Sequence, residues 1–176
     1  MKSQISVLKN SLSGDLLDGK FDNGRYSTDA SIYQIMPEAV ILPKNIEDIK
    51  KTIQFSQEHN IPILPRGGGT SQNGQTVNRA IVLDNSKYLN KIIEVDAINQ
   101  TCLVEPGVVL DELNRFLKPY GLWFPVDVST SSRATIGGMA GNNSAGGRSI
   151  RYGIMRDNVI SIDTLLSDAS EAHFGL

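Results

Sequence analysis

The stretch PRGGGTSQNGQ (residues 65–75) directly follows the apolar run IPIL (residues 61–64). Three consecutive glycines remove the Cβ penalty on positive φ, so the backbone can curl until successive N–H groups point into one concavity. Thr70 and Ser71 add hydroxyl groups, and Arg66 adds a charge that does not titrate away at physiological pH. The stretch therefore predicts a nest for an anion such as a phosphate or a pyrophosphate.

Two strands and a helix surround the approach to this loop. Residues 39–42 are all apolar and predict a strand, and residues 61–64 predict a second, short buried strand. Between them, residues 46–55 place isoleucines on one helical face, with Asn45 as the N-cap. Together they form a β-α-β unit with the loop at its carboxyl end, which is the edge where open α/β sheets bind ligands.

The rest of the chain predicts short strands and a few helices. Apolar residues between positions 5 and 16 recur at loose helical spacing and predict a short N-terminal helix. A second helix is expected at residues 110–117, where the Pro-Tyr-Gly at 119–121 stops it. The remaining expected strands are 80–84, 91–95, 101–105 and 158–166, with a hairpin partner beginning at 167. Because this hairpin opens so close to Leu176, we expect a longer parent protein.

The composition is that of a globular protein. The 176 residues are 40% hydrophobic with a formal charge of −2, and both signs are mixed along the chain, which argues against nucleic acid as a partner. The single cysteine, Cys102, lies in an alternating run and is expected to be a buried free thiol. The N-terminus lacks a signal-peptide core and no long apolar run occurs, so we expect a cytoplasmic protein.

A second segment rich in small residues, TIGGMAGNNSAGG, spans residues 135–147. Small side chains let the backbone approach either another part of the chain or a planar cofactor. Taken alone, this composition favours tight packing against another part of the chain. Taken together with the first glycine-rich loop, it favours a site for a planar cofactor. The first loop lacks the Lys-Ser/Thr pair of a Walker A sequence, and the second segment lacks the G-x-G-x-x-G spacing of a Rossmann turn. Neither NTP hydrolysis nor a nicotinamide fold is supported.

Five stretches, in this order and at this spacing, resemble the FAD-binding domain of the vanillyl-alcohol oxidase / p-cresol methylhydroxylase (PCMH-type) family. They are PRGGGTS with GQ (65–75), VEPG (104–107), FPVD with Ser131 (124–131), ATIGG (134–138) and RYG with DN (151–158). Within the family, the chain is most similar to FAD-linked 2-hydroxy-acid dehydrogenases of the D-lactate dehydrogenase, glycolate oxidase and D-2-hydroxyglutarate dehydrogenase type. The resemblance runs from about residue 26 to the end of the chain.

The resemblance implies an α+β fold, a PCMH-type FAD-binding domain of two α/β lobes with FAD extended between them. We expect residues 1–38 to form an N-terminal helix and wrapping segment. Residues 39–105 would form the first lobe with the pyrophosphate loop, and residues 106–176 an incomplete second lobe.

By the matching positions, the first loop would wrap the pyrophosphate, and the second segment would run along the ribityl chain and the flavin. The residues expected to bind FAD are Arg66, Gly67, Gly68, Gly69, Thr70, Ser71, Gly74, Gln75, Asp127, Ser131, Ala134, Thr135, Gly138, Asn142 and Gly146. Many relatives attach the flavin covalently to a histidine or a cysteine, but Gly69-Thr70 and Ser144-Ala145 occupy those regions here. We therefore expect noncovalent FAD.

The reaction that the resemblance implies is oxidation of a 2-hydroxy acid, with the α-hydrogen passing to flavin N5 and the electrons leaving to a separate acceptor. We expect no catalytic and no metal-binding residue in this chain, because in the family those groups lie mainly in a later cap domain. An iron–sulfur cluster, which some relatives carry, would lie outside these residues. Any peripheral membrane association would likewise belong to the full-length protein.

Several other side chains have simpler interpretations. His59 and His173 have no second ligand at metal-site spacing and are expected to be structural or exposed. Arg148 and Arg151 flank the second segment, but arginines in turns are usually solvated. The Trp-Phe pair at 123–124 is expected to pack in the core.

Two other functions stay open. One is a flavoenzyme of the same fold but another class, such as an alkylglycerone-phosphate synthase or a cell-wall precursor reductase. The other is a noncatalytic module that binds a nucleotide or a partner. The run from residue 124 to residue 156 favours the oxidoreductase over the first of these.

Overall fold

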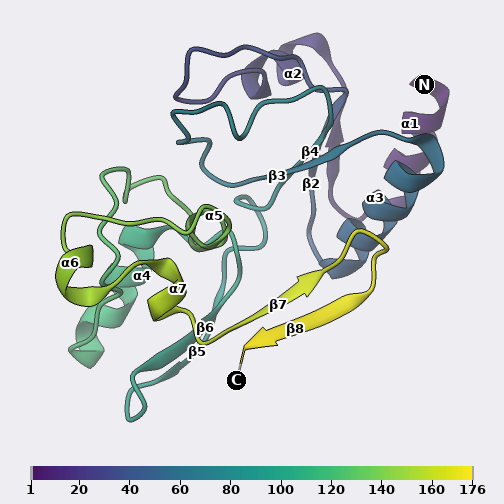
Figure 1. Ribbon diagram of the computed structural model, residues 1–176. Helices are drawn as coiled ribbons and strands as arrows, with labels where there is room; N and C mark the ends of the chain where they lie inside the picture. Colours follow the sequence, from purple (N-terminus) through teal and green to yellow (C-terminus); the bar gives the residue numbers. More distant parts are fainter. Residues whose placement is uncertain (1, 176) are drawn as a thin grey trace.

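A computed structural model describes residues 2–175, with the side chains of residues 2–4 left aside. The helices are α1 (Lys2–Ser11), α2 (Lys20–Tyr26), α3 (Ile46–His59), α4 (Leu110–Leu117), the 3-10 turn η1 (Lys118–Tyr120), α5 (Ile136–Gly141), α6 (Ser149–Tyr152) and α7 (Met155–Asn158). The strands are β1 (Asp15–Leu17), β2 (Ala39–Leu42), β3 (Ile63–Arg66), β4 (Ile81–Asp84), β5 (Ile92–Asp96), β6 (Thr101–Val104), β7 (Ser161–Leu165) and β8 (Glu171–Gly175). Figure 1 shows them arranged in two lobes.

The first lobe is built on a four-stranded sheet of order β1-β2-β4-β3. Strands β2, β4 and β3 run parallel, and β1 pairs antiparallel with β2. The predicted β-α-β unit is therefore confirmed, although β4 lies between its two strands. Every residue of β2 and β4 is buried, as expected for central strands covered on both faces.

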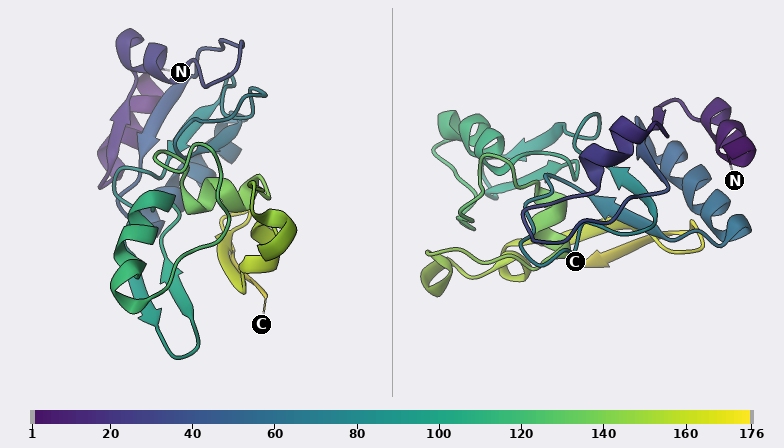
Figure 2. Two further views of the ribbon diagram at one scale, coloured as in Figure 1. Left: turned by 90° about the vertical axis from the view of Figure 1, so that its left-hand side faces the viewer. Right: turned by 90° about the horizontal axis from the view of Figure 1, so that it is seen from above.

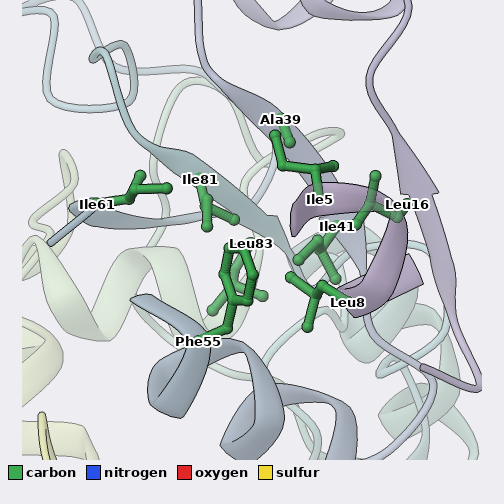
Figure 3. Packing of buried hydrophobic residues seen from close by; sticks show 9 residues of the cluster. All are labelled: Ile5, Leu8, Leu16, Ala39, Ile41, Phe55, Ile61, Ile81 and Leu83. Atoms are coloured by element: carbon green, nitrogen blue, oxygen red, sulfur yellow. The ribbon is translucent and has the colours of Figure 1, made fainter. Parts of the chain in front are cut away.

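The main core lies between this sheet and two helices. Figure 3 shows Ile5 and Leu8 of α1 and Phe55 of α3 packed against Ile41 and Leu83 of the sheet. The side chain of Asn45 accepts a hydrogen bond from the Asp48 amide at 2.9 Å and so caps α3 as predicted. A smaller apolar cluster covers the opposite face of the sheet around Val40 and Val82.

Two boundaries in this lobe differ from the sequence prediction. Strand β3 begins at Ile63, two residues later than expected, because the amide of Ile61 instead donates to the Ser56 carbonyl at the end of α3. Helix α1 ends at Ser11, and Leu16 lies in β1 rather than in a continued helix. The buried carboxylate of Asp48 accepts hydrogen bonds from the amides that follow α1, which fixes the turn there.

The second lobe has its own core, in which the β5–β6 hairpin packs against α4. Val95 and Cys102 of the hairpin contact the cluster formed by Val108, Leu113 and Leu117. Strand β1 and α1, in turn, belong to the sheet and core of the first lobe. We therefore propose that the first lobe comprises about residues 2–85 and that residues 92–105 belong with the second, which differs from the division expected at 39 and 105.

The β7–β8 hairpin returns from the second lobe to the first, as Figure 1 and the right-hand view of Figure 2 show. Its turn meets α3, where Gln57 Nε2 donates to the Ser167 carbonyl at 2.7 Å and Lys50 lies 2.7 Å from Glu171. This hairpin was expected from the alternation of the sequence. Between residues 2 and 175, none of the helices combines the length and the apolar composition that crossing a bilayer requires.

Candidate functional site

A groove lies at the carboxyl edge of the parallel strands, where the two lobes meet. It encloses about 580 Å³. The first glycine loop forms one wall, and α5 with the segments around it forms the other. The lining residues are Pro65, Arg66, Gly67, Gly68, Gly69, Thr70, Ser71, Gln72, Asn73, Gln75, Thr76, Asn85, Pro106, Val128, Ser129, Thr130, Ala134, Thr135, Gly137, Gly138, Met139, Gly141, Asn142, Ser144 and Ala145.

The first loop presents unpaired backbone donors to this groove. Among the residues that the structure describes, no protein atom accepts a hydrogen bond from the amides of residues 67–72. These amides belong to consecutive residues that all line the groove. Residues 67 and 69–71 are half-buried, and an N–H shielded from water without an acceptor costs about 1–3 kcal/mol, so such a series favours an anionic ligand. The anion nest stays a prediction, which these unpaired amides support.

The glycines of this loop are required by contact with the second lobe. A Cβ on Gly67 would lie 2.1 Å from Thr135 Oγ1, and a Cβ on Gly68 would lie 2.2 Å from the Arg133 carbonyl oxygen. Gly69 has a φ of 64°, a conformation that L side chains rarely adopt. Residues 67 and 68 therefore form the joint between the lobes, while residue 69 turns the loop.

Helix α5 begins at the second wall, but its first amides are already paired. Ile136 and Gly137 donate to the carbonyls of Val108 and Pro106, both at 2.8 Å. The side chain of Thr135 accepts from Gly138 at 3.3 Å. The sequence did not predict this helix, because glycine disfavours helices and the capping partners come from a distant segment. The anion nest consequently rests on the first loop alone.

One hydrogen bond crosses the groove between its walls. Gln75 Nε2 donates to Asn142 Oδ1 at 2.9 Å, and Ser71 Oγ donates to Gln75 Oε1. These side chains come from the first loop and from the residue that follows α5. The structure therefore brings together three predicted binding residues at one end of the groove.

Eleven of the fifteen predicted binding residues line the groove, and four do not: Gly74, Asp127, Ser131 and Gly146. Gly74 has a φ of 73° and lies against the ring of Tyr33. Asp127 Oδ1 accepts from the Arg148 amide at 2.9 Å, and a Cβ on Gly146 would lie 2.3 Å from the same oxygen. Asp127 and Gly146 therefore shape a turn beside the second wall, whereas Gly74 shapes the first loop.

The guanidinium of Arg66 is occupied by protein acceptors. It donates to the carbonyls of Tyr26, Thr28 and Thr76 at 2.8–3.2 Å. Burial lowers the pKa of Arg66 from its usual value, while nearby Asp84 acts in the opposite sense. Arg66 lines the groove as predicted, but its hydrogen bonds hold the loop.

Sequence reasoning missed Asn85, which lines the groove. Its amide donates to the Arg66 carbonyl at 3.1 Å, so its backbone is fixed beside the loop. Its side-chain Oδ1 is buried and has no hydrogen-bond partner among the described residues. Asn85 directly follows β4, so applying the carboxyl-edge rule to that strand as well as to β3 would have found it.

The remaining side chains lie elsewhere. His173 pairs with Asp163 at 2.7 Å on the exposed hairpin, and the His59 ring packs on Phe55 at a centroid distance of 4.1 Å. Trp123 is 42% exposed and meets the edge of Tyr152, so the expectation of core packing was wrong for it. Within residues 2–175, no group of three or more His, Cys, Asp or Glu side chains is arranged to hold a metal ion.

The class of protein to which this fold belongs follows from a comparison of its sequence with known families. The family model described as "FAD binding domain" matches residues 37–175, and the chain belongs to this family. Its α+β architecture is similar to that of p-cresol methylhydroxylase, with a TM-score of 0.82 at 20% identity over 98% of this chain and 35% of that one. This similarity confirms the predicted PCMH-type fold.

Two relatives resemble this chain more strongly in amino-acid sequence than p-cresol methylhydroxylase does. The chain is 39% identical over 156 residues to D-2-hydroxyglutarate dehydrogenase of Pantoea ananatis, covering 87% of this chain and 15% of that protein. It is 40% identical over 146 residues to glycolate oxidase subunit GlcD of Bacillus subtilis, covering 81% of this chain and 31% of that protein. The chain therefore spans less than a third of the length of either relative.

Proposed function

We propose that this chain is the FAD-binding portion of a flavin-dependent oxidoreductase that oxidises a 2-hydroxy acid. The observation that carries the proposal is the series of unpaired amides at residues 67–72, which suits a pyrophosphate. The identity to D-2-hydroxyglutarate dehydrogenase and to the glycolate oxidase subunit supports the substrate class. D-2-hydroxyglutarate, glycolate and D-lactate are the candidate substrates.

The groove suits a dinucleotide in two respects. Its first wall offers amide donors and the hydroxyl of Thr70, which would hold the pyrophosphate, while the Ser71 hydroxyl donates to Gln75. Its second wall is lined by small residues such as Gly138 and Ala145, which leave room for a flat group. Asn85 also lines the groove, and its buried Oδ1 has no hydrogen-bond donor among the described residues. When bound, the flavin would supply the hydride acceptor, while these residues bind and orient it.

We propose that FAD is held without a covalent bond. None of the residues that line the groove is a histidine or a cysteine, so none offers the usual side chain for flavin attachment. Cys102 is half-buried rather than fully buried as expected; it packs against the core of the second lobe, and burial raises the pKa of its thiol. Denaturation should therefore release all of the flavin. Flavin that stays with acid-precipitated protein would contradict this proposal.

Other features of the proposal concern the whole protein. Electrons would pass from the reduced flavin to a separate acceptor, and any iron–sulfur cluster or membrane contact would reside outside these 176 residues. We place the protein in the cytoplasm, as the sequence predicts. The groups that bind and deprotonate the substrate are expected in regions of the relatives that this chain does not align with.

The test has two steps. In the first, FAD is titrated into the 176-residue chain, with ADP as a competitor and riboflavin as the analogue without a pyrophosphate. We expect saturable FAD binding that ADP displaces, and weaker binding of riboflavin. A Kd weaker than about 1 mM, which is worth only about 4 kcal/mol, would refute the assignment of the groove.

In the second step, the full-length flavoprotein is mixed anaerobically with D-2-hydroxyglutarate, D-lactate or glycolate. Bleaching of the visible flavin absorption by one of them would identify the substrate. Bound flavin that none of them reduces would favour a flavoenzyme of another class on the same fold. A full-length protein that binds nucleotides but no flavin would favour the noncatalytic module.

A further inference from the structure

We propose that Arg66, together with the N-terminal segment 26–33, is a positioning device that sets the conformation of the cofactor loop, and that its charge does not bind the pyrophosphate directly. This inference rests on the proposed function of the loop. The family model begins at residue 37, so the segment that supplies half of the device lies outside the region that it matches.

The first argument is the geometry of the guanidinium. Nη1 donates to the carbonyl oxygens of Tyr26 at 3.2 Å and Thr76 at 3.0 Å, and Nη2 donates to that of Thr28 at 2.8 Å. Three chain segments are thereby joined at one planar group. A planar fork of donors can serve such divergent acceptors, whereas the compact ammonium of lysine cannot do so in the same way.

The orientation of the guanidinium is fixed by a second set of contacts. It lies over the ring of Tyr26 at 5.2 Å, and the Tyr26 hydroxyl donates to Asp84 Oδ2 at 2.7 Å. Asp84 is 7% exposed and ends β4, so the chain of contacts terminates in the sheet. Burial and the bond to Asp84 raise the pKa of Tyr26, which keeps its hydroxyl a neutral donor.

The guanidinium also supports the turn at the centre of the glycine loop. A Cβ on Gly69 would lie 2.5 Å from Arg66 Nη2, so the backbone at residue 69 rests directly on this group. The positive φ of Gly69 is the step that redirects the chain between residues 68 and 70. Arg66 therefore acts on the part of the loop whose amides are unpaired.

The far end of the loop is held by the same N-terminal segment. Asp29 Oδ2 accepts from Thr76 Oγ1 at 3.0 Å and from the Thr76 amide at 3.4 Å. The ring of Tyr33 lies against Gly74, where an added Cβ would meet Cδ2 at 2.5 Å. The loop is thus anchored at residues 66, 69, 74 and 76, and the unpaired amides lie within this span. Such preorganisation lowers the ordering cost that ligand binding would otherwise carry.

The experiment compares Arg66→Lys, which keeps the charge, with Arg66→Met, which keeps most of the length. Arg79→Lys is the matched control, because Arg79 is an exposed arginine of the same lobe that does not line the groove. The Kd for FAD and for ADP is measured well below the melting temperature of every variant. We expect both Arg66 variants to bind at least about tenfold more weakly than the wild type and to about the same extent, because only the fork can hold the loop.

Three outcomes would overturn the inference. Wild-type affinity in Arg66→Lys with a large loss in Arg66→Met would show that the charge contacts the ligand. Unchanged Kd values in both variants, with only a lower melting temperature, would show a structural role alone. Additive losses in Arg66→Lys and Asp29→Asn would also contradict it, because two anchors of one loop should couple in a double-mutant cycle.

A readout without FAD separates this inference from the proposed function. Amide hydrogen exchange across residues 67–76 should be faster in Arg66→Lys than in the wild type and in Arg79→Lys, while exchange in β2 and β4 stays unchanged. Equal loop exchange in all three proteins would refute the positioning role. If the loop exchanges faster as expected but the wild type binds neither FAD nor ADP, the positioning role stands and the proposed function fails.

Discussion

Replacing Gly68 with alanine tests whether the contact between the two lobes requires a glycine at this position of the loop. A Cβ at this position would lie 2.2 Å from the Arg133 carbonyl oxygen and 2.9 Å from its carbon. Contacts of real Cβ atoms are essentially never shorter than 3.0 Å, so the two backbones must separate by about 0.8 Å. Overpacking of this kind costs about 1–3 kcal/mol, which exceeds the about 0.4–1 kcal/mol gained when a glycine of the unfolded chain becomes less flexible.

We expect Gly68→Ala to lower the free energy of unfolding by about 1–2 kcal/mol in urea titrations and to weaken FAD binding, because the nest and the second wall move apart. Gly24→Ala is the control, since an added Cβ there meets nothing within 4 Å. It should leave FAD affinity unchanged and stabilise α2 slightly. If Gly68→Ala unfolds like Gly24→Ala and binds FAD as tightly as the wild type, the assignment of this glycine to the joint is wrong.

Three further predictions concern single side chains. Asp48 is fully buried, and its carboxylate accepts hydrogen bonds from three backbone amides. Asp48→Ala should therefore lower the free energy of unfolding, measured by chemical denaturation, by about 3 kcal/mol or more, and a loss below about 1 kcal/mol would contradict this. Asn85→Leu removes a buried side-chain oxygen that has no hydrogen-bond donor, so it should leave the apoprotein at least as stable as the wild type but weaken FAD binding about tenfold. A loss of stability with an unchanged Kd would reverse the interpretation. Burial alone would raise the pKa of Asp29, but hydrogen bonds from Ser31 and Thr76 outweigh burial and lower that pKa. The ionised carboxylate therefore stabilises the loop at pH values above the ordinary pKa of about 3.9, and this stabilisation is lost as the pH falls through the lowered pKa. The protection factors of the loop amides, which are corrected for the slower intrinsic exchange at low pH, should therefore fall on acidification in the wild type more than in Asp29→Asn, and an equal fall would refute the assignment.

The parts of the fold that the sequence predicted are those with local causes. Helix α3 was expected from its N-cap and its apolar face, and β2 and β4 from their continuous apolar runs. The position of the glycine loop followed from the β-α-β unit alone. These features depend on residues that are close together in the chain, and the physical rules for them are short-range.

The parts that the sequence did not predict depend on distant partners. Helix α5 exists because the carbonyls of Pro106 and Val108 accept its first amides, some thirty residues away in the chain. The end of α1 depends on the carboxylate of Asp48, which lies on another helix. The orientation of the Arg66 side chain likewise depends on carbonyls at residues 26 and 28. The residue type predicted a charge near an anion, but the acceptors that engage that charge are set by tertiary structure.

The two glycine-rich segments have different structural roles in joining the lobes. Ordinary side chains at positions 67 and 68 would keep the first loop from reaching Thr135 and Arg133. With glycine there, the Cα faces of the loop contact the second lobe, and the amides of residues 67–72 stay without protein acceptors. The second segment, in contrast, uses its own first amides to join α5 to the turn at 106–108. The lobes are therefore joined by glycine contacts that leave one row of donors available, which is the arrangement that an extended anionic cofactor between two lobes requires.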